Sequence, residues 1–85
     1  MSDVVMYSTG FCPYCVRAKM LLKQKNVDFT DVRIDVDAHR RDEMEERSGR
    51  TSVPQIFIDD FHVGGCDDLF ALEQAGELDG KLGLN

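Results

Sequence analysis

Two cysteines three positions apart, Cys12 and Cys15, are the residues of this sequence best suited to chemistry. They follow a short apolar run and stand where a helix should begin, with Pro13 at its first position. A thiol at a helix start faces unpaired backbone N–H groups and the positive end of the helix dipole, which stabilise its thiolate. The second sulfur lies one turn away and can close a disulfide that expels a captured thiol. The spacing therefore predicts thiol–disulfide exchange.

The segment behind Cys12 is basic, although the whole chain is acidic. Residues 11–26 contain four basic residues and no acidic one, while the 85-residue chain has a formal net charge of −6. Arg17 and Lys19 are nearest to the thiol and are expected to add modestly to thiolate stability. Lys23 and Lys25 suit the negative end of the helix and are expected to be solvated.

The composition fits one ordinary globular domain that covers residues 1–85, with 42% hydrophobic and 31% charged residues. No apolar run approaches the roughly 20 residues of a membrane-spanning helix, and the first residues do not read as a signal peptide. Three cysteines, an odd number, argue against a secreted disulfide framework, so we expect a cytoplasmic protein. An isoelectric point near 4.7 argues against nucleic acid or an anionic membrane surface as a partner.

Hydrophobic periodicity predicts the element order βαβαββα. A continuous apolar run marks a buried first strand, alternation marks a half-buried second strand, and Asp59-Asp60 marks a tight hairpin. A helix between two parallel strands gives a crossover unit, so the fold class is α/β, a thioredoxin fold with a four-stranded mixed sheet in the order 2-1-3-4 flanked by helices. The predicted strands are residues 4–7, 30–36, 55–58 and 61–63, and the predicted helices run from Pro13 to Asn26, from a cap at Asp37 to Gly49, and from Cys66 or Asp67 to Gly76.

Val53-Pro54 stands just before the third predicted strand. A cis bond there would end the preceding loop sharply and leave Val53 extended, with N–H and C=O free to pair with an extended ligand. An ordinary trans proline opening a strand is the alternative.

The segment Gly64-Gly65-Cys66-Asp67-Asp68 combines two glycines, a helix start and two carboxylates. The helix N–H groups suit a ligand carboxylate, and the aspartates suit an ammonium group. A ligand with an adjacent amine and carboxylate, such as the γ-glutamyl end of glutathione, fits this pattern. Simple N-capping by Asp67 is the alternative.

Together these segments closely resemble glutaredoxin, in its small bacterial dithiol form. The resemblance rests on residues 12–15, 17–19, 53–58 and 64–69 and covers nearly the whole chain. It implies that Cys12 is the nucleophile, that Cys15 is the resolving thiol and that Pro54 is cis. It also implies a monomer that uses glutathione as co-substrate, with no metal, and glutathione contacts from Tyr14, Ser52, Val53, Pro54, Cys66, Asp67 and Asp68.

The sequence departs from the family pattern in two places. Thr9 occupies the position where glutaredoxins usually carry a lysine that helps to hold the glycyl carboxylate, and Ser52 replaces the usual threonine. Arg41 stands where the family places a polar or basic contact to the same carboxylate, and we expect it to replace the lysine in part.

The leading hypothesis is a glutathione-dependent thiol–disulfide oxidoreductase that reduces glutathionylated and oxidised proteins and donates electrons to enzymes such as ribonucleotide reductase. One alternative is a hydrogen donor reduced by thioredoxin reductase. Another is a zinc or iron–sulfur module that uses Cys12, Cys15 and Cys66, although no second paired motif completes four ligands. His39 and His62 are expected to be solvated, and neither has a context that marks it as a base.

Overall fold

A computed structural model describes residues 2–84. The strands form one mixed sheet in the order β2-β1-β3-β4, in which β1 runs parallel to β2 and antiparallel to β3, and β3 and β4 form an antiparallel hairpin. The predicted thioredoxin-type sheet order is therefore confirmed. The elements are β1 (Val4–Ser8), α1 (Pro13–Gln24), β2 (Thr30–Arg33), α2 (His39–Ser48), β3 (Gln55–Ile58), β4 (Phe61–Gly64), α3 (Cys66–Gln74) and α4 (Leu78–Leu82).

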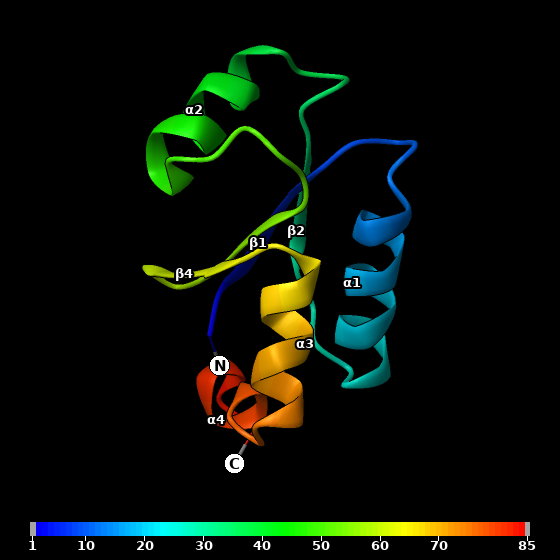
Figure 1. The fold of residues 1–85 in the computed structure, drawn as a ribbon, viewed down its shortest axis with the longest axis vertical. Coiled ribbons are helices and arrows are strands. Elements are labelled where there is room, and N and C mark those ends of the chain that lie inside the picture. The colour runs from blue at the N-terminus through cyan, green and yellow to red at the C-terminus, as the bar shows by residue number, and fades with distance from the viewer. Residues whose placement is uncertain (1, 85) are drawn as a thin grey trace.

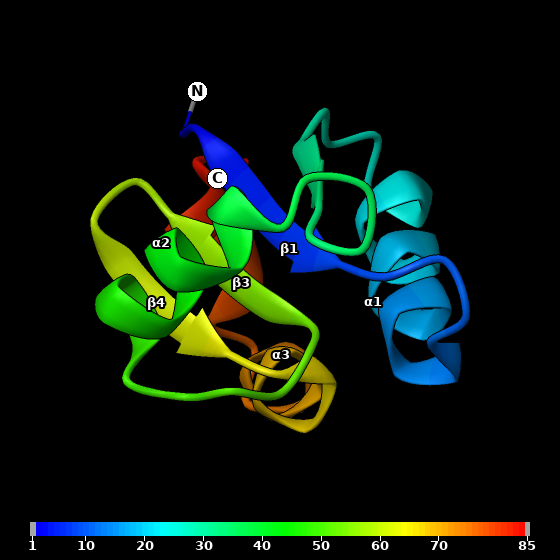
Figure 2. The same ribbon diagram turned by 90° about the horizontal axis from the view of Figure 1, so that it is seen from above.

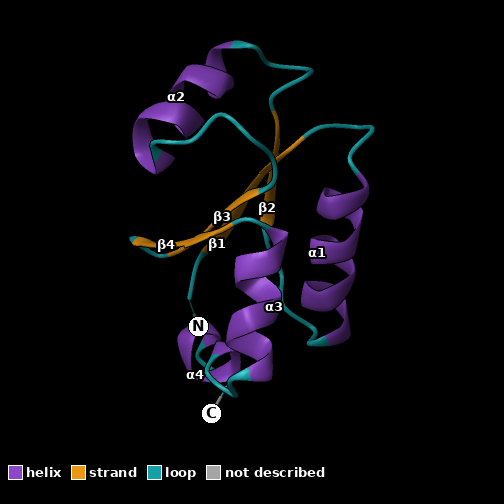
Figure 3. Cartoon of the chain, viewed as in Figure 1, coloured by secondary structure: helices purple, strands orange, loops and turns teal. Residues whose placement is uncertain are grey.

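The sheet separates two layers of helix. Figures 1 and 3 show α1 and α3 together on one side of the sheet and α2 alone on the other, and Figure 2 looks onto the α2 side. Alternate residues of β1 serve the two sides, since Met6 joins the α1/α3 core and Tyr7 joins the α2 core. The first core is the larger, and α2 buries only Met44.

Two predicted boundaries around α2 are wrong. The second strand ends at Arg33 rather than Val36, because the backbone turns there and the N–H groups of Val36 and Asp37 both donate to the Arg33 carbonyl. Val36 is consequently 76% exposed. Asp37 is not the cap of α2, since Ala38 holds that position without a side-chain hydrogen bond. The predicted end of α2 is confirmed by Gly49 in the left-handed conformation (φ 70°).

The C-terminal helices also refine the predictions. Gly65, rather than Asp67, is the N-cap of α3, and the Asp68 carboxylate accepts a hydrogen bond from the Gly65 N–H. Residues 78–82 form the short helix α4 despite Gly80, because Leu78 and Leu82 are both buried against the core. Among residues 2–84, no helix combines the length and the apolar character needed to cross a membrane.

Candidate active site

Cys12 occupies the N-cap position of α1. Its backbone is extended (φ −130°, ψ 103°), Pro13 opens the helix, and the Cys15 N–H donates to the Cys12 Sγ at 3.1 Å. An N–H group at a helix start has no partner within the helix and normally donates to a side-chain oxygen, whereas here the Cys12 sulfur is the acceptor. The Cys12 thiol also donates to the Val53 carbonyl at 3.8 Å. The first cysteine is thus held by a helix end on one side and by the loop before β3 on the other.

Cys15 has a different environment on the next turn of α1. It is 1% exposed, and burial, together with the hydrogen bond that its thiol donates to the Cys12 sulfur, raises the pKa of the Cys15 thiol to about 12. The backbone of Thr9 lowers it by a smaller amount. Cys15 is therefore a protonated thiol at neutral pH, and all three cysteines are free.

The loop before β3 contains the cis peptide that the family resemblance implied, between Val53 and Pro54. This loop meets the start of α3 around a hollow of about 230 Å³. Figure 1 shows the starts of α1 and α3 at the same end of their shared layer. The residues that line the hollow are Tyr14, Arg50, Ser52, Val53, Pro54, Gly65, Cys66, Asp67 and Asp68.

Every predicted glutathione contact except Arg41 lines this hollow. The Arg41 guanidinium instead donates to the Thr51 carbonyl at 3.4 Å and lies 3.7 Å from the Glu45 carboxylate. The arginine at the hollow is Arg50, whose Nη1 lies 3.1 Å from Asp68 Oδ2. Sequence reasoning missed Arg50, although a basic residue two positions before Ser52 was a signal that could have found it.

The Asp68 carboxylate is held in place at the start of α3. The Gly65 N–H, at 2.9 Å, and the Arg50 guanidinium both lower the pKa of the Asp68 carboxyl. Gly64 lies directly beneath, with φ +112°, and a side chain there would place its Cβ 2.2 Å from Asp68 Oδ2. The glycine is therefore required both by its conformation and by the close carboxylate. Asp67, on the same helical turn, is exposed.

The comparisons with known proteins agree with this geometry. The family model described as glutaredoxin matches residues 4–63. Glutaredoxin 3 of Escherichia coli K12 is 57% identical over 82 residues, which are 96% of this chain and 99% of that protein. The chain belongs to the glutaredoxin family.

Solved structures place this glutaredoxin among relatives of the same fold. The solution structure of glutaredoxin from Brucella melitensis is 51% identical, with a TM-score of 0.85 over 99% of this chain and 91% of that one. A crystal structure of a buckwheat glutaredoxin–glutathione complex is 27% identical, with a TM-score of 0.89 over 96% of this chain and 77% of that one. Family and fold together make this chain a thiol–disulfide oxidoreductase.

The basic segment of this glutaredoxin is more neutralised than its sequence indicated. Lys19 pairs with Asp31 at 2.6 Å. Lys25 is not solvated, because Glu73 and Asp79 bind its ammonium group at 2.8 and 2.6 Å. Arg17 lies over the Phe70 ring, 5.4 Å from its centroid. The charge that follows the first thiol therefore serves mainly to join α1 to β2, α3 and α4.

The predictions for Cys66, His39 and His62 have different outcomes. Cys66 lines the hollow but is only 4% exposed, and burial raises the pKa of its thiol. His39 is exposed as predicted, whereas His62 is partly buried and bonded to Gln55 rather than solvated. Within residues 2–84, no group of three or more His, Cys, Asp or Glu side chains is arranged to hold a metal ion.

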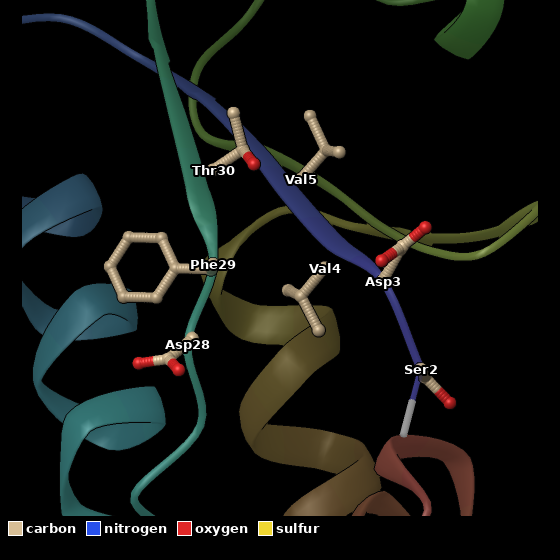
Figure 4. Close-up of a pocket in the computed structure, with 7 residues that line it drawn as sticks. All are labelled: Ser2, Asp3, Val4, Val5, Asp28, Phe29 and Thr30. Carbon is tan, nitrogen blue, oxygen red and sulfur yellow. The ribbon is translucent and has the colours of Figure 1, made fainter.

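A larger hollow, of about 450 Å³, lies at the opposite end of the parallel strands β1 and β2. Figure 4 shows that its two carboxylates, Asp3 and Asp28, lie on opposite sides and do not converge. Its lining contains no cysteine, histidine or basic residue. It offers no thiol and no pair of opposite charges.

Proposed function

We propose that this chain is a glutathione-dependent oxidoreductase that reduces protein–glutathione mixed disulfides and protein disulfides. The observation that carries the proposal is the unequal environment of the two thiols at the start of α1, next to the hollow that Tyr14 and Val53 line. Cys12 is capped by a backbone N–H donor at 3.1 Å, whereas Cys15 is buried and its pKa is raised to about 12. Such a pair separates an attacking sulfur from a resolving one.

With a glutathionylated protein, the Cys12 thiolate attacks the glutathione sulfur. The bond between the two substrate sulfurs breaks, the protein leaves as a thiolate that takes up a proton, and Cys12 becomes disulfide-bonded to glutathione. A second glutathione, as its thiolate, attacks that glutathione sulfur, releases Cys12 and forms glutathione disulfide. One free glutathione is thus consumed for each mixed disulfide, because the substrate's own glutathione becomes the other half of the glutathione disulfide, and Cys15 takes no part.

With a protein disulfide, Cys12 first forms a mixed disulfide with one substrate sulfur. Cys15 then loses its proton and attacks the Cys12 sulfur, which releases the second substrate thiol and leaves a Cys12–Cys15 disulfide. Two glutathione molecules reduce this bond. We expect ribonucleotide reductase to be one recipient of these electrons, and we expect the chain to act as a cytoplasmic monomer with a single domain.

The hollow supplies the groups that glutathione requires. We propose that the Val53 backbone pairs with the cysteinyl residue and that the first N–H groups of α3 receive the γ-glutamyl carboxylate. Asp67 and Asp68 are assigned to the ammonium group beside that carboxylate, with Tyr14, Ser52, Pro54 and Cys66 as walls. Arg50, whose guanidinium is paired with Asp68, is assigned to the γ-glutamyl carboxylate beside that ammonium group, and Arg41 contributes indirectly by holding the Thr51 carbonyl.

The test compares two reducing systems and one pair of substrates. Turnover should be supported by glutathione with glutathione reductase and not by thioredoxin reductase, whose support would favour the alternative hydrogen donor. Cysteinyl-glutathione should be a better substrate than its N-acetylated analogue, and the double variant Asp67→Asn, Asp68→Asn should lose that preference. Asparagine still caps helices, so a variant that kept the preference would exclude the proposed ammonium contact.

A further inference from the structure

A buried amide joins the active-site loop to β4. Gln55 is 0% exposed, and its Nε2 donates to the Ser52 carbonyl at 3.0 Å and to the Ser52 Oγ at 3.3 Å. A backbone carbonyl only accepts hydrogen bonds, so the NH₂ group of Gln55 must face Ser52. The amide oxygen then faces the other way and needs a donor of its own, because a buried unpaired oxygen would be costly.

His62 supplies that donor from β4. Its Nε2 lies 2.7 Å from the Gln55 Oε1, and its ring stacks on Phe57 with 4.7 Å between centroids and 22° between planes. Burial lowers the pKa of His62, followed by the charge of Arg50. Because the Gln55 Oε1 can only accept, the His62 ring must carry a proton on Nε2, where it fixes the amide orientation of Gln55.

The orientation of the Gln55 amide determines the direction of the peptide group between Ser52 and Val53. The Ser52 carbonyl and the Val53 N–H belong to one planar trans peptide, so they point in opposite directions. Holding the carbonyl toward Gln55 directs the Val53 N–H away from it. Among residues 2–84, that N–H takes part in no backbone hydrogen bond, and Val53 lines the hollow beside Cys12.

We propose that His62 is a positioning residue, which acts through Gln55 to aim the Val53 N–H at an extended substrate bound beside Cys12. The inference rests on the proposed function, since it needs a substrate whose backbone pairs with Val53. The substrate class is a disulfide carried on an extended peptide, glutathione included, and small disulfides without a backbone carbonyl do not use this contact. His62 touches neither the sulfur atoms nor the substrate.

The principal test uses His62→Phe, which keeps an aromatic ring on Phe57 but removes the donor. The KM for a glutathionylated peptide should rise about threefold to tenfold, as expected for one weakened hydrogen bond, with kcat nearly unchanged. Reaction of Cys12 with iodoacetamide, which has no peptide backbone to position, should stay at the wild-type rate. His62→Gln, whose amide can still donate, should restore the KM. His39→Phe, at an exposed position of α2, is the matched control.

A double-mutant cycle keeps the test decisive if the variants differ in stability. Gln55→Leu should raise the KM by itself, and adding His62→Phe to it should raise the KM no further, because His62 acts only through Gln55. Additive effects, an unchanged KM in His62→Phe, or an equal loss of iodoacetamide reactivity would each overturn the inference. The proposed function would fail separately, through a wild-type protein that does not turn over with glutathione.

Discussion

The two hollows of this molecule lie at opposite ends of the same parallel strands and differ in what converges on them. The larger one, of about 450 Å³, lies beside the first residues of β1 and β2 and offers carboxylates that point apart. The smaller one, of about 230 Å³, is lined by Arg50 and the start of α3, and Cys12 lies next to it through its contact with the carbonyl of the lining residue Val53. Convergent donors at helix starts, rather than volume, therefore mark the reactive end.

Removing the Cys12 thiol is the most direct test of this difference between the two ends. Cys12→Ser should abolish turnover with every disulfide substrate, because within residues 2–84 no other sulfur caps a helix beside the hollow. Cys15→Ser should retain reduction of glutathione mixed disulfides and lose reduction of protein disulfides. Steady-state assays of both variants on both substrates check this. A Cys15→Ser protein that fails on mixed disulfides would show that the roles are assigned wrongly.

Alkylation gives the next largest contrast, within the reactive end itself. At pH 8 a thiol with a pKa of about 12 is thiolate in only about one molecule in ten thousand, so Cys15 should resist iodoacetamide while Cys12 reacts. Peptide mapping after brief labelling should find the modification on Cys12. Labelling of Cys15 at a similar rate would contradict the burial argument.

The same thiol predicts how stability depends on pH. The pKa of Cys15 is 9.0 in its ordinary state and about 12 in the folded protein, so the folded state binds the proton more tightly. Its contribution to the free energy of unfolding is complete below pH 9 and falls as the pH rises toward 12. Denaturant titrations of wild type and Cys15→Ser across this range should converge at the alkaline end.

Sequence reasoning predicted the backbone around Cys12 and before α3 well because its features are local. The positions of Cys12, Pro13 and the two glycines before α3 follow from caps and turns that a few neighbouring residues specify. Arg50 was not assigned to the hollow and His62 was wrongly predicted to be solvated, because their contacts run across the sheet and between loops. Asp68 and Gln55, their partners, lie 18 and seven positions away in the chain.

The region around α2 shows the opposite case. Alternating apolar residues predicted a strand that extended to Val36, with Asp37 as the cap of the next helix, and both predictions are wrong. The carbonyl of Arg33 decides the boundary, because it accepts the two N–H groups that turn the chain. Such a backbone turn leaves little trace in side-chain pattern.

Replacing Arg50 or Arg41 should have a smaller effect, and the two variants test which arginine serves the hollow. Arg50→Gln should raise the KM for glutathione several-fold, because it removes the cation that lines the hollow. Arg41→Gln should have a weaker effect, since its guanidinium binds the Thr51 carbonyl rather than the hollow. The Arg50 effect should shrink in high salt, as expected for an exposed charge. A larger loss in Arg41→Gln would return the carboxylate contact to the residue that the sequence indicated.

The smallest effect is expected at the larger hollow, where a change should leave activity intact. The double variant Asp3→Asn, Asp28→Asn removes both of its charges while keeping the side-chain shapes. Neither carboxylate is joined to the Cys12 region by a hydrogen bond or an ion pair among residues 2–84. The kcat and KM should therefore remain within about twofold of wild type. The measurement is the same mixed-disulfide assay, with thermal unfolding as the control for folding. A marked loss of turnover in a variant that unfolds at the wild-type temperature would mean that the two ends of the sheet are coupled, and that convergence of donors alone does not define the active region.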